Sequence, residues 1–211
     1  MKYSDGRPVE IAFLIEISSK FPQMFLNEKG RTSVKNDGLM PSVLSGPVLD
    51  FLMPKITLLG NGGAIWILAA LILLCTKKYR RQGVLLLVGL IAGVLVGNAC
   101  LKNLIARPRP CWLDSSVQLL IANPADYSFP SGHTLSSVIG ATVLTKTNRR
   151  FGYAAIPLAA LIAFSRLYLY VHFPSDVLAA AVLGVALGEL VWRCGGKLLE
   201  RWHAPRGRQR A

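Results

Sequence analysis

Two residues near the end of the chain stand at a spacing suited to catalysis. His172 and Asp176 are four residues apart, and Pro174 lies between them. Proline suits the first turn of a helix, so we expect Asp176 to lie just inside a helix and to reach a nitrogen of the His172 ring. A carboxylate there fixes the tautomer of an imidazole and supports its protonated form. The pair predicts nucleophilic or acid–base chemistry.

A second histidine follows a segment that is typical of an anion site. The sequence Pro130-Ser131-Gly132-His133 places a proline, a serine and a glycine before an apolar stretch. Such a segment opens a helix and offers backbone N–H groups and a hydroxyl at the positive end of the helix. We therefore expect Ser131 and Gly132 to bind an anion beside His133.

Cationic side chains occur near the ends of apolar stretches, where ionisable residues are costly and usually functional. Lys102 and Arg109 are seven residues apart, or two helical turns, so we expect both on one helix face before Pro108 and Pro110 end the helix. Arg166 adds a third cation. Three cations, two imidazoles and one carboxylate fit phosphoryl transfer, in which cations neutralise phosphate oxygens, one histidine attacks and the other protonates the leaving oxygen.

The composition predicts a membrane protein. The 211 residues are 52% hydrophobic and only 17% charged, against about a quarter charged in soluble domains, and the mean hydropathy is +0.43. The net charge of +13 would suggest nucleic acid if the basic residues formed one patch, but they are distributed over several loops. The four cysteines show no CxxC motif or histidine at ligand spacing, so we expect no metal and no disulfide framework.

Apolar stretches long enough to cross a bilayer predict an all-α polytopic helix bundle with about five transmembrane helices. We expect the spans at 56–75, 83–101, 132–145, 151–170 and 175–193. The stretch at 132–145 is short and contains hydroxyl groups, which suits a helix surrounded by protein rather than by lipid.

The regions outside these spans complete the expected organisation. Residues 9–26 are too polar to insert and predict an amphipathic helix at the interface, followed by a linker at 27–42. We therefore divide the chain into an N-terminal interfacial segment and linker at 1–50, a transmembrane domain at 51–195 and a basic tail at 196–211.

The positions of the basic residues predict the orientation. Three segments that alternation places on one side hold 13 of the 24 lysines and arginines: Lys77, Lys78, Arg80 and Arg81; Lys146, Arg149 and Arg150; and Arg193, Lys197, Arg201, Arg206, Arg208 and Arg210. The positive-inside rule makes that side, with the C-terminus, cytoplasmic. We therefore expect a multi-pass cell-membrane protein whose site faces the extracytoplasmic side.

Several other residues carry structural expectations. We interpret Arg107 as an interfacial anchor, with a head-group contact as the alternative. Trp66, Trp112 and Trp192 suit interfacial belts. Glycines repeat every four residues at 89, 93 and 97 and again at 184 and 188, which predicts close helix packing, with a homodimer as the alternative.

The reactive segments together resemble the signature of the type 2 phosphatidic acid phosphatase superfamily, which includes membrane lipid phosphatases. The family pattern K-x6-R-P is matched by Lys102 with Arg109-Pro110. The pattern P-S-G-H is matched by residues 130–133. The pattern S-R-x5-H-x3-D is matched by Ser165-Arg166, His172 and Asp176. All three parts occur in order and without a substitution.

The resemblance implies a role for each matched residue. His172 would be the nucleophile that forms a phosphohistidine, Asp176 would hold its other nitrogen, and His133 would be the general acid. Phosphate oxygens would be bound by Lys102, Arg109, Ser131, Gly132 and Arg166. The resemblance implies neither a metal nor another cofactor.

The motifs indicate a phosphate but leave the lipid open. The resemblance implies a membrane lipid carrying a phosphate or diphosphate, with undecaprenyl diphosphate as the leading substrate. Phosphatidylglycerophosphate and phosphatidic acid are alternatives. A lipid phosphotransferase and a head-group binder without catalysis are further alternatives, and no nucleic-acid partner is expected.

Overall fold

A computed structural model describes residues 46–114 and 117–203, and the residues described form helices and loops without a strand. The expected amphipathic helix at 9–26 and the linker at 27–42 lie outside the described residues. The described elements are, in order, α2 (Pro47–Leu59), η1 (Asn61–Gly63), α3 (Ala64–Cys75), α4 (Arg80–Gly93), the π-helical η2 (Val94–Leu101), α5 (Lys102–Ile105), α6 (Pro110–Leu113), α7 (Gly132–Thr147), α8 (Arg149–Tyr168) and α9 (Pro174–His203).

The described helices include fewer candidate spans than the five expected from the sequence. Three segments are long and apolar enough to cross a membrane: Arg80–Leu113, Arg149–Tyr168 and Pro174–Gly195. A fourth span results if α2 and the η1–α3 segment, which meet at 45°, are counted together. The first apolar stretch thus begins earlier than residue 56 and is bent near Gly60. The expected span at 132–145 corresponds to α7, which has 16 residues and is shorter than the other candidates.

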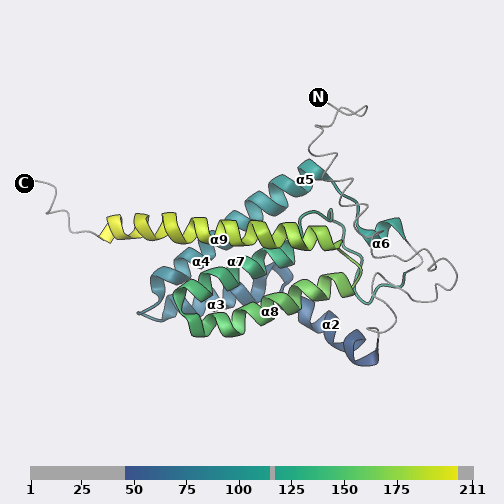
Figure 1. The fold of residues 1–211 in the computed structure, drawn as a ribbon, viewed down its shortest axis with the longest axis horizontal. Helices are drawn as coiled ribbons and strands as arrows, with labels where there is room; N and C mark the ends of the chain where they lie inside the picture. The colour runs from purple at the N-terminus through teal and green to yellow at the C-terminus, as the bar shows by residue number, and fades with distance from the viewer. Residues whose placement is uncertain (1–45, 115–116, 204–211) are drawn as a thin grey trace, which may run out of the picture.

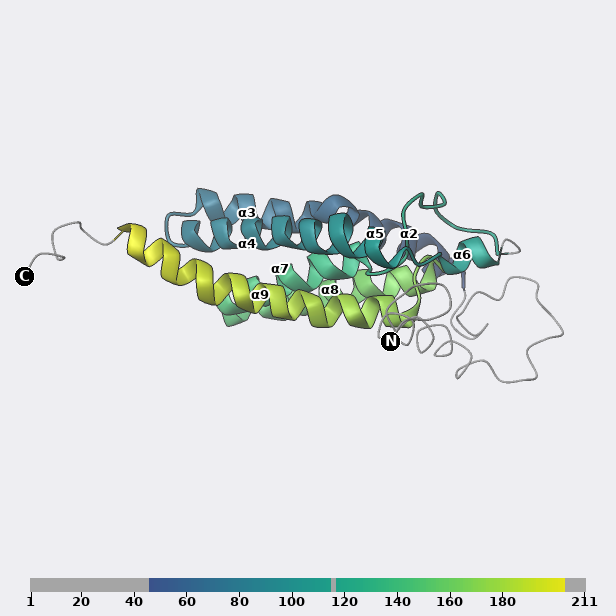
Figure 2. The same cartoon turned by 90° about the horizontal axis from the view of Figure 1, so that it is seen from above.

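Helix α7 lies at the centre of the bundle. It packs against α8 and α9 on one side and against α4 on the other, and Figure 2 shows α3 and α4 above the α7–α9 layer. Its Leu135, Ile139 and Val143 side chains are fully buried. A short helix containing serines and threonines is therefore enclosed by other helices, as its composition predicts.

The two ends of the bundle differ in character. The chain segments around α5, α6 and the start of α9 gather at one end, whereas the α3–α4 turn, the α7–α8 turn and the C-terminal end of α9 lie at the other (Figure 1). The described lysines and arginines expected on the cytoplasmic side belong to this second end.

The outer surface of the bundle is apolar. Large hydrophobic side chains such as Leu68, Ile72, Ile91, Leu95 and Val182 are exposed along α3, α4, η2 and α9. Soluble monomers rarely expose apolar surface on this scale. This surface therefore suits contact with lipid hydrocarbon.

One of the tryptophans expected at an interface is instead part of the core. Trp66 is buried, and its indole N–H donates to the hydroxyl of Ser137 on α7 at 3.0 Å. Gly140, one turn further along α7, leaves room for the ring. The belt interpretation of Trp66 is therefore wrong, because a polar partner inside the bundle satisfies its N–H group.

The repeated glycines of α4, η2 and α9 all face α7. A Cβ atom at Gly89 or Gly93 would meet the side chain of Ile139, and one at Gly184 or Gly188 would meet that of Val138 or Thr142. Small residues allow helix backbones to approach closely. The two stripes therefore serve packing within the chain on both sides of α7.

We predict that Gly140→Ala destabilises the bundle. The added Cβ would lie 2.4 Å from an atom of the buried Trp66 ring, and overpacking of this kind typically costs about 1–3 kcal/mol. Thermal unfolding of the purified protein in detergent should show a lower midpoint. Val182→Ala, at a side chain that is 73% exposed on α9, is the control and should leave the midpoint nearly unchanged; an unchanged midpoint for Gly140→Ala would contradict the packing described here.

Candidate active site

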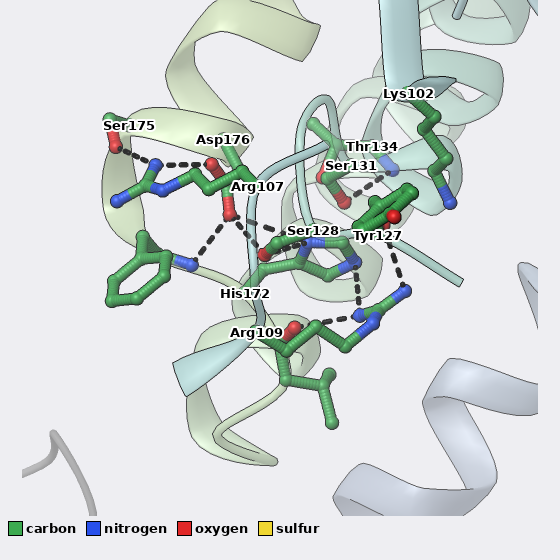
Figure 3. A network of polar contacts seen from close by, with 12 residues as sticks. Lys102, Arg107, Arg109, Tyr127, Ser128, Ser131, Thr134, His172, Ser175 and Asp176 are labelled. Atoms are coloured by element: carbon green, nitrogen blue, oxygen red, sulfur yellow. Dashed lines mark hydrogen bonds and ion pairs between the residues drawn. The ribbon is translucent and has the colours of Figure 1, made fainter. Parts of the chain in front are cut away.

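The site lies at the end of the bundle where several helices begin or end. The start of α7, the start of α9, the end of α8 and the segment after α5 contribute its side chains (Figures 1 and 3). Each of these backbone segments is fixed by packing in the bundle. The side chains that they carry can therefore converge although they are distant in sequence.

The path of the chain through the first motif differs from the one expected. Helix α5 ends at Ile105, and Ala106 adopts a left-handed conformation with φ 48°. Arg109 follows in an extended conformation. Lys102 and Arg109 therefore do not share a helix face, and the expectation from their spacing is wrong, because a left-handed residue ends the helix between them. They meet instead through a common carboxylate.

That carboxylate is Asp126, in the loop before α7. It forms ion pairs with Lys102 Nζ and, at 2.6 Å, with Arg109 Nη2. Burial alone would raise the pKa of Asp126, but its hydrogen bond to Lys102 and the charges of Lys102 and Arg109 outweigh burial and lower the pKa to about 2. Asp126 is therefore ionised at neutral pH, and its side chain is 58% exposed.

Arg109 links this loop to His172. Its side chain is buried, and its Nη1 donates to the Val171 carbonyl oxygen at 2.7 Å and lies 3.1 Å from His172 Nε2. Its Nε donates to the backbone oxygen of Asp126 at 2.6 Å. Because guanidinium only donates hydrogen bonds, His172 Nε2 is the acceptor and carries a lone pair toward Arg109.

His172 is almost completely enclosed. Its Nδ1 lies 3.6 Å from Asp176 Oδ2 and 3.4 Å from the Ser128 hydroxyl, which donates to the same Asp176 oxygen at 2.5 Å (Figure 3). Burial is the largest influence on the ring and lowers the pKa of His172 to about 4; Asp176 opposes this shift, and Arg109 and Arg166 reinforce it. The imidazole is therefore neutral at neutral pH, which is the form that can attack phosphorus.

Asp176 is held by several donors around His172. The Phe173 backbone N–H donates to Asp176 Oδ2 at 2.9 Å, and Arg107 Nη1 lies 2.5 Å from Oδ1. Arg107 is thus buried and paired with a carboxylate. Its interpretation as an interfacial anchor is wrong, because the turn at Ala106 directs the chain back into the protein.

Arg166 approaches the site from the end of α8. Its Nη1 donates to the hydroxyl of Thr57 on α2 at 2.6 Å. Its Nε is buried without a hydrogen-bond acceptor among the described residues. An unpaired buried donor is unusual, and here it belongs to a side chain that lines the cavity described below.

His133 lies in the first turn of α7. Its Nε2 is 2.8 Å from Oδ1 of Asn61, which belongs to η1. An amide oxygen only accepts hydrogen bonds, so His133 Nε2 carries a proton. Gly62 and Gly63 follow Asn61 with φ of 57° and 74°, conformations that glycine adopts without strain. This left-handed turn directly follows the residue that contacts His133.

The predicted helix start at Ser131 is present, but its hydroxyl serves the helix. Ser131 is the N-cap of α7, and its buried Oγ accepts hydrogen bonds from the N–H group and the hydroxyl of Thr134. Gly132 lies closer to the open space, beside the amide of Asn98 in η2. The backbone of the α7 N-terminus therefore faces the site, while Ser131 supports it.

These side chains surround a cavity of about 530 Å³. Six of the eight residues predicted from sequence line it: Lys102, Arg109, Gly132, His133, Arg166 and His172. Ser131 and Asp176 lie behind this lining. Leu58, Leu90 and Val94 add an apolar wall. The cavity therefore combines positively charged side chains with a surface suited to hydrocarbon.

Sequence reasoning did not identify four of the residues that support this set, and it assigned Arg107 a different role. Asp126, Ser128 and Asn61 have no spacing that distinguishes them from ordinary loop residues. Thr57 is a polar residue within an apolar stretch, and Arg107 is an ionisable residue at the end of a span. Both are signals that point to function.

With this geometry established, the comparisons with known proteins define the family. The model of the PAP2 superfamily matches residues 82–200, which include all three sequence motifs. The chain therefore belongs to the PAP2 superfamily. The resemblance stated from the motifs is confirmed.

Individual relatives carry lipid phosphatase names. An "Undecaprenyl-diphosphatase" of Sulfolobus acidocaldarius is 35% identical over 57% of this chain, which spans 58% of that relative's length. "Undecaprenyl-diphosphatase BcrC" of Bacillus subtilis is 31% identical over 69% of this chain and 75% of the relative. "Phosphatidylglycerophosphatase B" of the same organism is 31% identical, with 69% and 74% covered.

Two solved structures share the fold. The structure of Aquifex aeolicus LpxE aligns with a TM-score of 0.63 and 29% identity, and covers 72% of this chain and 89% of its own. A PAP2-type phosphatidylglycerolphosphate phosphatase from Bacillus subtilis aligns with a TM-score of 0.61 and 23% identity over 95% and 98% of the two chains. The second likeness concerns the fold alone.

We predict that Asp126→Asn binds inorganic phosphate more tightly than the unaltered protein. The substitution removes a charge that competes for Lys102 and Arg109, and exposed ion pairs are worth about 0.2–1 kcal/mol each, so loss of the two pairs should give a gain of roughly two- to thirtyfold. Product inhibition by phosphate or inhibition by vanadate would measure it. Asp126→Glu, which keeps the charge, is the control. Weaker binding by Asp126→Asn would instead show that Asp126 is needed to hold the two cations.

Proposed function

We propose that this protein is an integral-membrane phosphatase that removes a phosphate from a lipid phosphate or diphosphate. The observation that carries the proposal is the cavity in which two imidazoles and three cations from separate helices meet beside an apolar wall. Cations neutralise the oxygens of a phosphoryl group, and the imidazoles supply a nucleophile and an acid. An apolar wall suits the hydrocarbon of a lipid.

The reaction proceeds in two steps in this proposal. His172 Nε2 attacks phosphorus, and the bond from phosphorus to the leaving lipid oxygen breaks. His133 gives its proton to that oxygen. Water then attacks the phosphohistidine, giving up a proton to His133, and the N–P bond breaks to release inorganic phosphate. The phosphoryl oxygens are held by Lys102, Arg109, Arg166 and the N–H group of Gly132. Asp176 holds the His172 ring, and Ser131 holds the start of α7.

The leading substrate is undecaprenyl diphosphate, which would yield undecaprenyl phosphate. The undecaprenyl-diphosphatase relatives at 31–35% identity support it. A second candidate is phosphatidylglycerophosphate, which the 31% identity to a phosphatidylglycerophosphatase favours. Phosphatidic acid is a third lipid that the same phosphate chemistry would accept.

We further place the site on the extracytoplasmic side of the cell membrane. The loops and helix ends around the cavity lie opposite the end that carries the described basic turns, and the positive-inside rule assigns that basic end to the cytoplasm. In this arrangement residues 1–50 are the interfacial segment, 51–195 the phosphatase domain and 196–211 the cytoplasmic tail.

A substrate panel would test the reaction and the lipid. We expect purified protein in EDTA to release phosphate from undecaprenyl diphosphate with a higher kcat/KM than from phosphatidylglycerophosphate or phosphatidic acid. A preference for a glycerophospholipid would replace the leading substrate by the second candidate. Transfer of the phosphoryl group to an added acceptor lipid, without release of free phosphate, would indicate a phosphotransferase.

We predict that His172→Ala abolishes hydrolysis while lipid binding persists. The substitution removes the attacking nitrogen but leaves the three cations, so turnover should fall below about one-thousandth of its original value, and binding of the lipid phosphate should change far less. Phosphate release and a lipid-binding assay would measure the two effects. His203→Ala, at the opposite end of α9, is the control. Retained hydrolysis in His172→Ala would overturn the assignment of the nucleophile.

A further inference from the structure

A buried arginine behind His172 lies outside the residues assigned to phosphate binding. Arg107 is 5% exposed, and its Nη1 contacts Asp176 Oδ1 at 2.5 Å and the hydroxyl of Ser175 at 2.9 Å. Its guanidinium carbon lies 3.8 Å from the centre of the Phe173 ring. Arg107 therefore contacts three residues around the start of α9, the segment that carries Asp176.

The backbone directs Arg107 and Arg109 to different places. The chain leaves α5 through the left-handed Ala106, and Arg109 is extended. In a regular extended segment, residues two apart point to the same side. The two arginines do not follow that rule, because Arg109 lines the cavity whereas Arg107 is directed at Asp176. Figure 3 shows Arg107 and Arg109 on different sides of His172.

We propose that Arg107 is a positioning residue of the active site, which fixes the Asp176 carboxylate and offsets its charge so that His172 stays oriented and neutral for attack. The inference rests on the proposed function, in which His172 is the nucleophile. Arg107 acts through Asp176 and has no contact with the cavity that holds the phosphate.

The charges around His172 explain why this offset matters. The charges of Arg109 and Arg166 oppose protonation of the His172 ring, whereas Asp176 favours it. A charge on His172 would in turn act on His133. Asp176 reaches His172 with Oδ2, while Oδ1 is directed at Arg107. Without Arg107, the full charge of Asp176 would act on the imidazole and raise its pKa.

The pH profile of kcat/KM tests this role. His172 must be neutral to attack, so activity is lost as the pH falls through its pKa. In Arg107→Gln, we expect this acid limb to move upward by about 0.5–1 pH unit and kcat to fall roughly ten- to a hundredfold, as when an orienting partner of a functional group is removed. Arg107→Lys keeps the charge and should leave the acid limb near its original position.

Matched variants keep the test decisive if Arg107→Gln fails to fold. Ser175→Ala loosens Arg107 without removing it and should move the acid limb in the same direction by a smaller amount. Arg149→Gln, an exposed residue at the opposite end of the bundle, should leave the profile unchanged. An unmoved acid limb in Arg107→Gln, or in Ser175→Ala when the former does not fold, would overturn the inference.

A substrate-free measurement separates this inference from the proposed function. The chain contains three histidines, so each imidazole can be followed by NMR in ¹⁵N-histidine-labelled protein, with His172→Ala assigning one signal. The His172 titration should move to higher pH in Arg107→Gln. If it moves but His172→Ala still hydrolyses lipid, the proposed function fails and the pairing stands. If His172→Ala is inactive but the titration does not move, the inference about Arg107 alone fails.

Discussion

The concentration of positive charge at one end of an apolar bundle is the constraint on which the site depends. Lys102, Arg109 and Arg166 are all buried and lie around one cavity with two imidazoles. Burial of like charges is unfavourable unless anions or hydrogen bonds compensate for it. The Asp126 carboxylate, backbone carbonyl oxygens and one hydroxyl provide part of that compensation. A phosphate group would complete it, so in the proposed function the cost of assembling the cations contributes to affinity for the phosphate of the substrate.

The apolar packing of the bundle fixes the backbone segments that carry the polar groups. Glycine stripes on both sides of α7 bring α4 and α9 close to it, and Trp66 fills the space beside Gly140. Such packing leaves little freedom at the helix ends. The polar side chains at the ends of α7, α8 and α9 can then remain near one another, although water would solvate each of them more favourably. The apolar packing therefore supports the polar site energetically.

The sequence predicted the reactive residues better than the geometry that connects them. Motif spacing identified the lining residues because residue type and order persist whatever the local backbone does. The helix face proposed for Lys102 and Arg109 was wrong, because the left-handed conformation of Ala106 depends on tertiary packing and not on a glycine or asparagine signal. Arg107 was misread for the same reason. The bend near Gly60 and the burial of Trp66 depend on contacts with α7, over seventy residues away, which no local pattern encodes.

The two carboxylates of the site differ in a way that follows from their surroundings. Asp176 is fully buried and receives hydrogen bonds from Ser128, from the Phe173 backbone and from Arg107. Its removal from these donors would leave several buried groups unsatisfied, so we expect it to stay in place throughout the proposed reaction. Asp126 is more than half exposed and belongs to a loop. Water can solvate its carboxylate when a phosphate displaces it from Lys102 and Arg109. In the proposed reaction, one carboxylate is therefore a permanent part of the site, and the other is an exchangeable counter-ion for the cations that we propose bind the substrate.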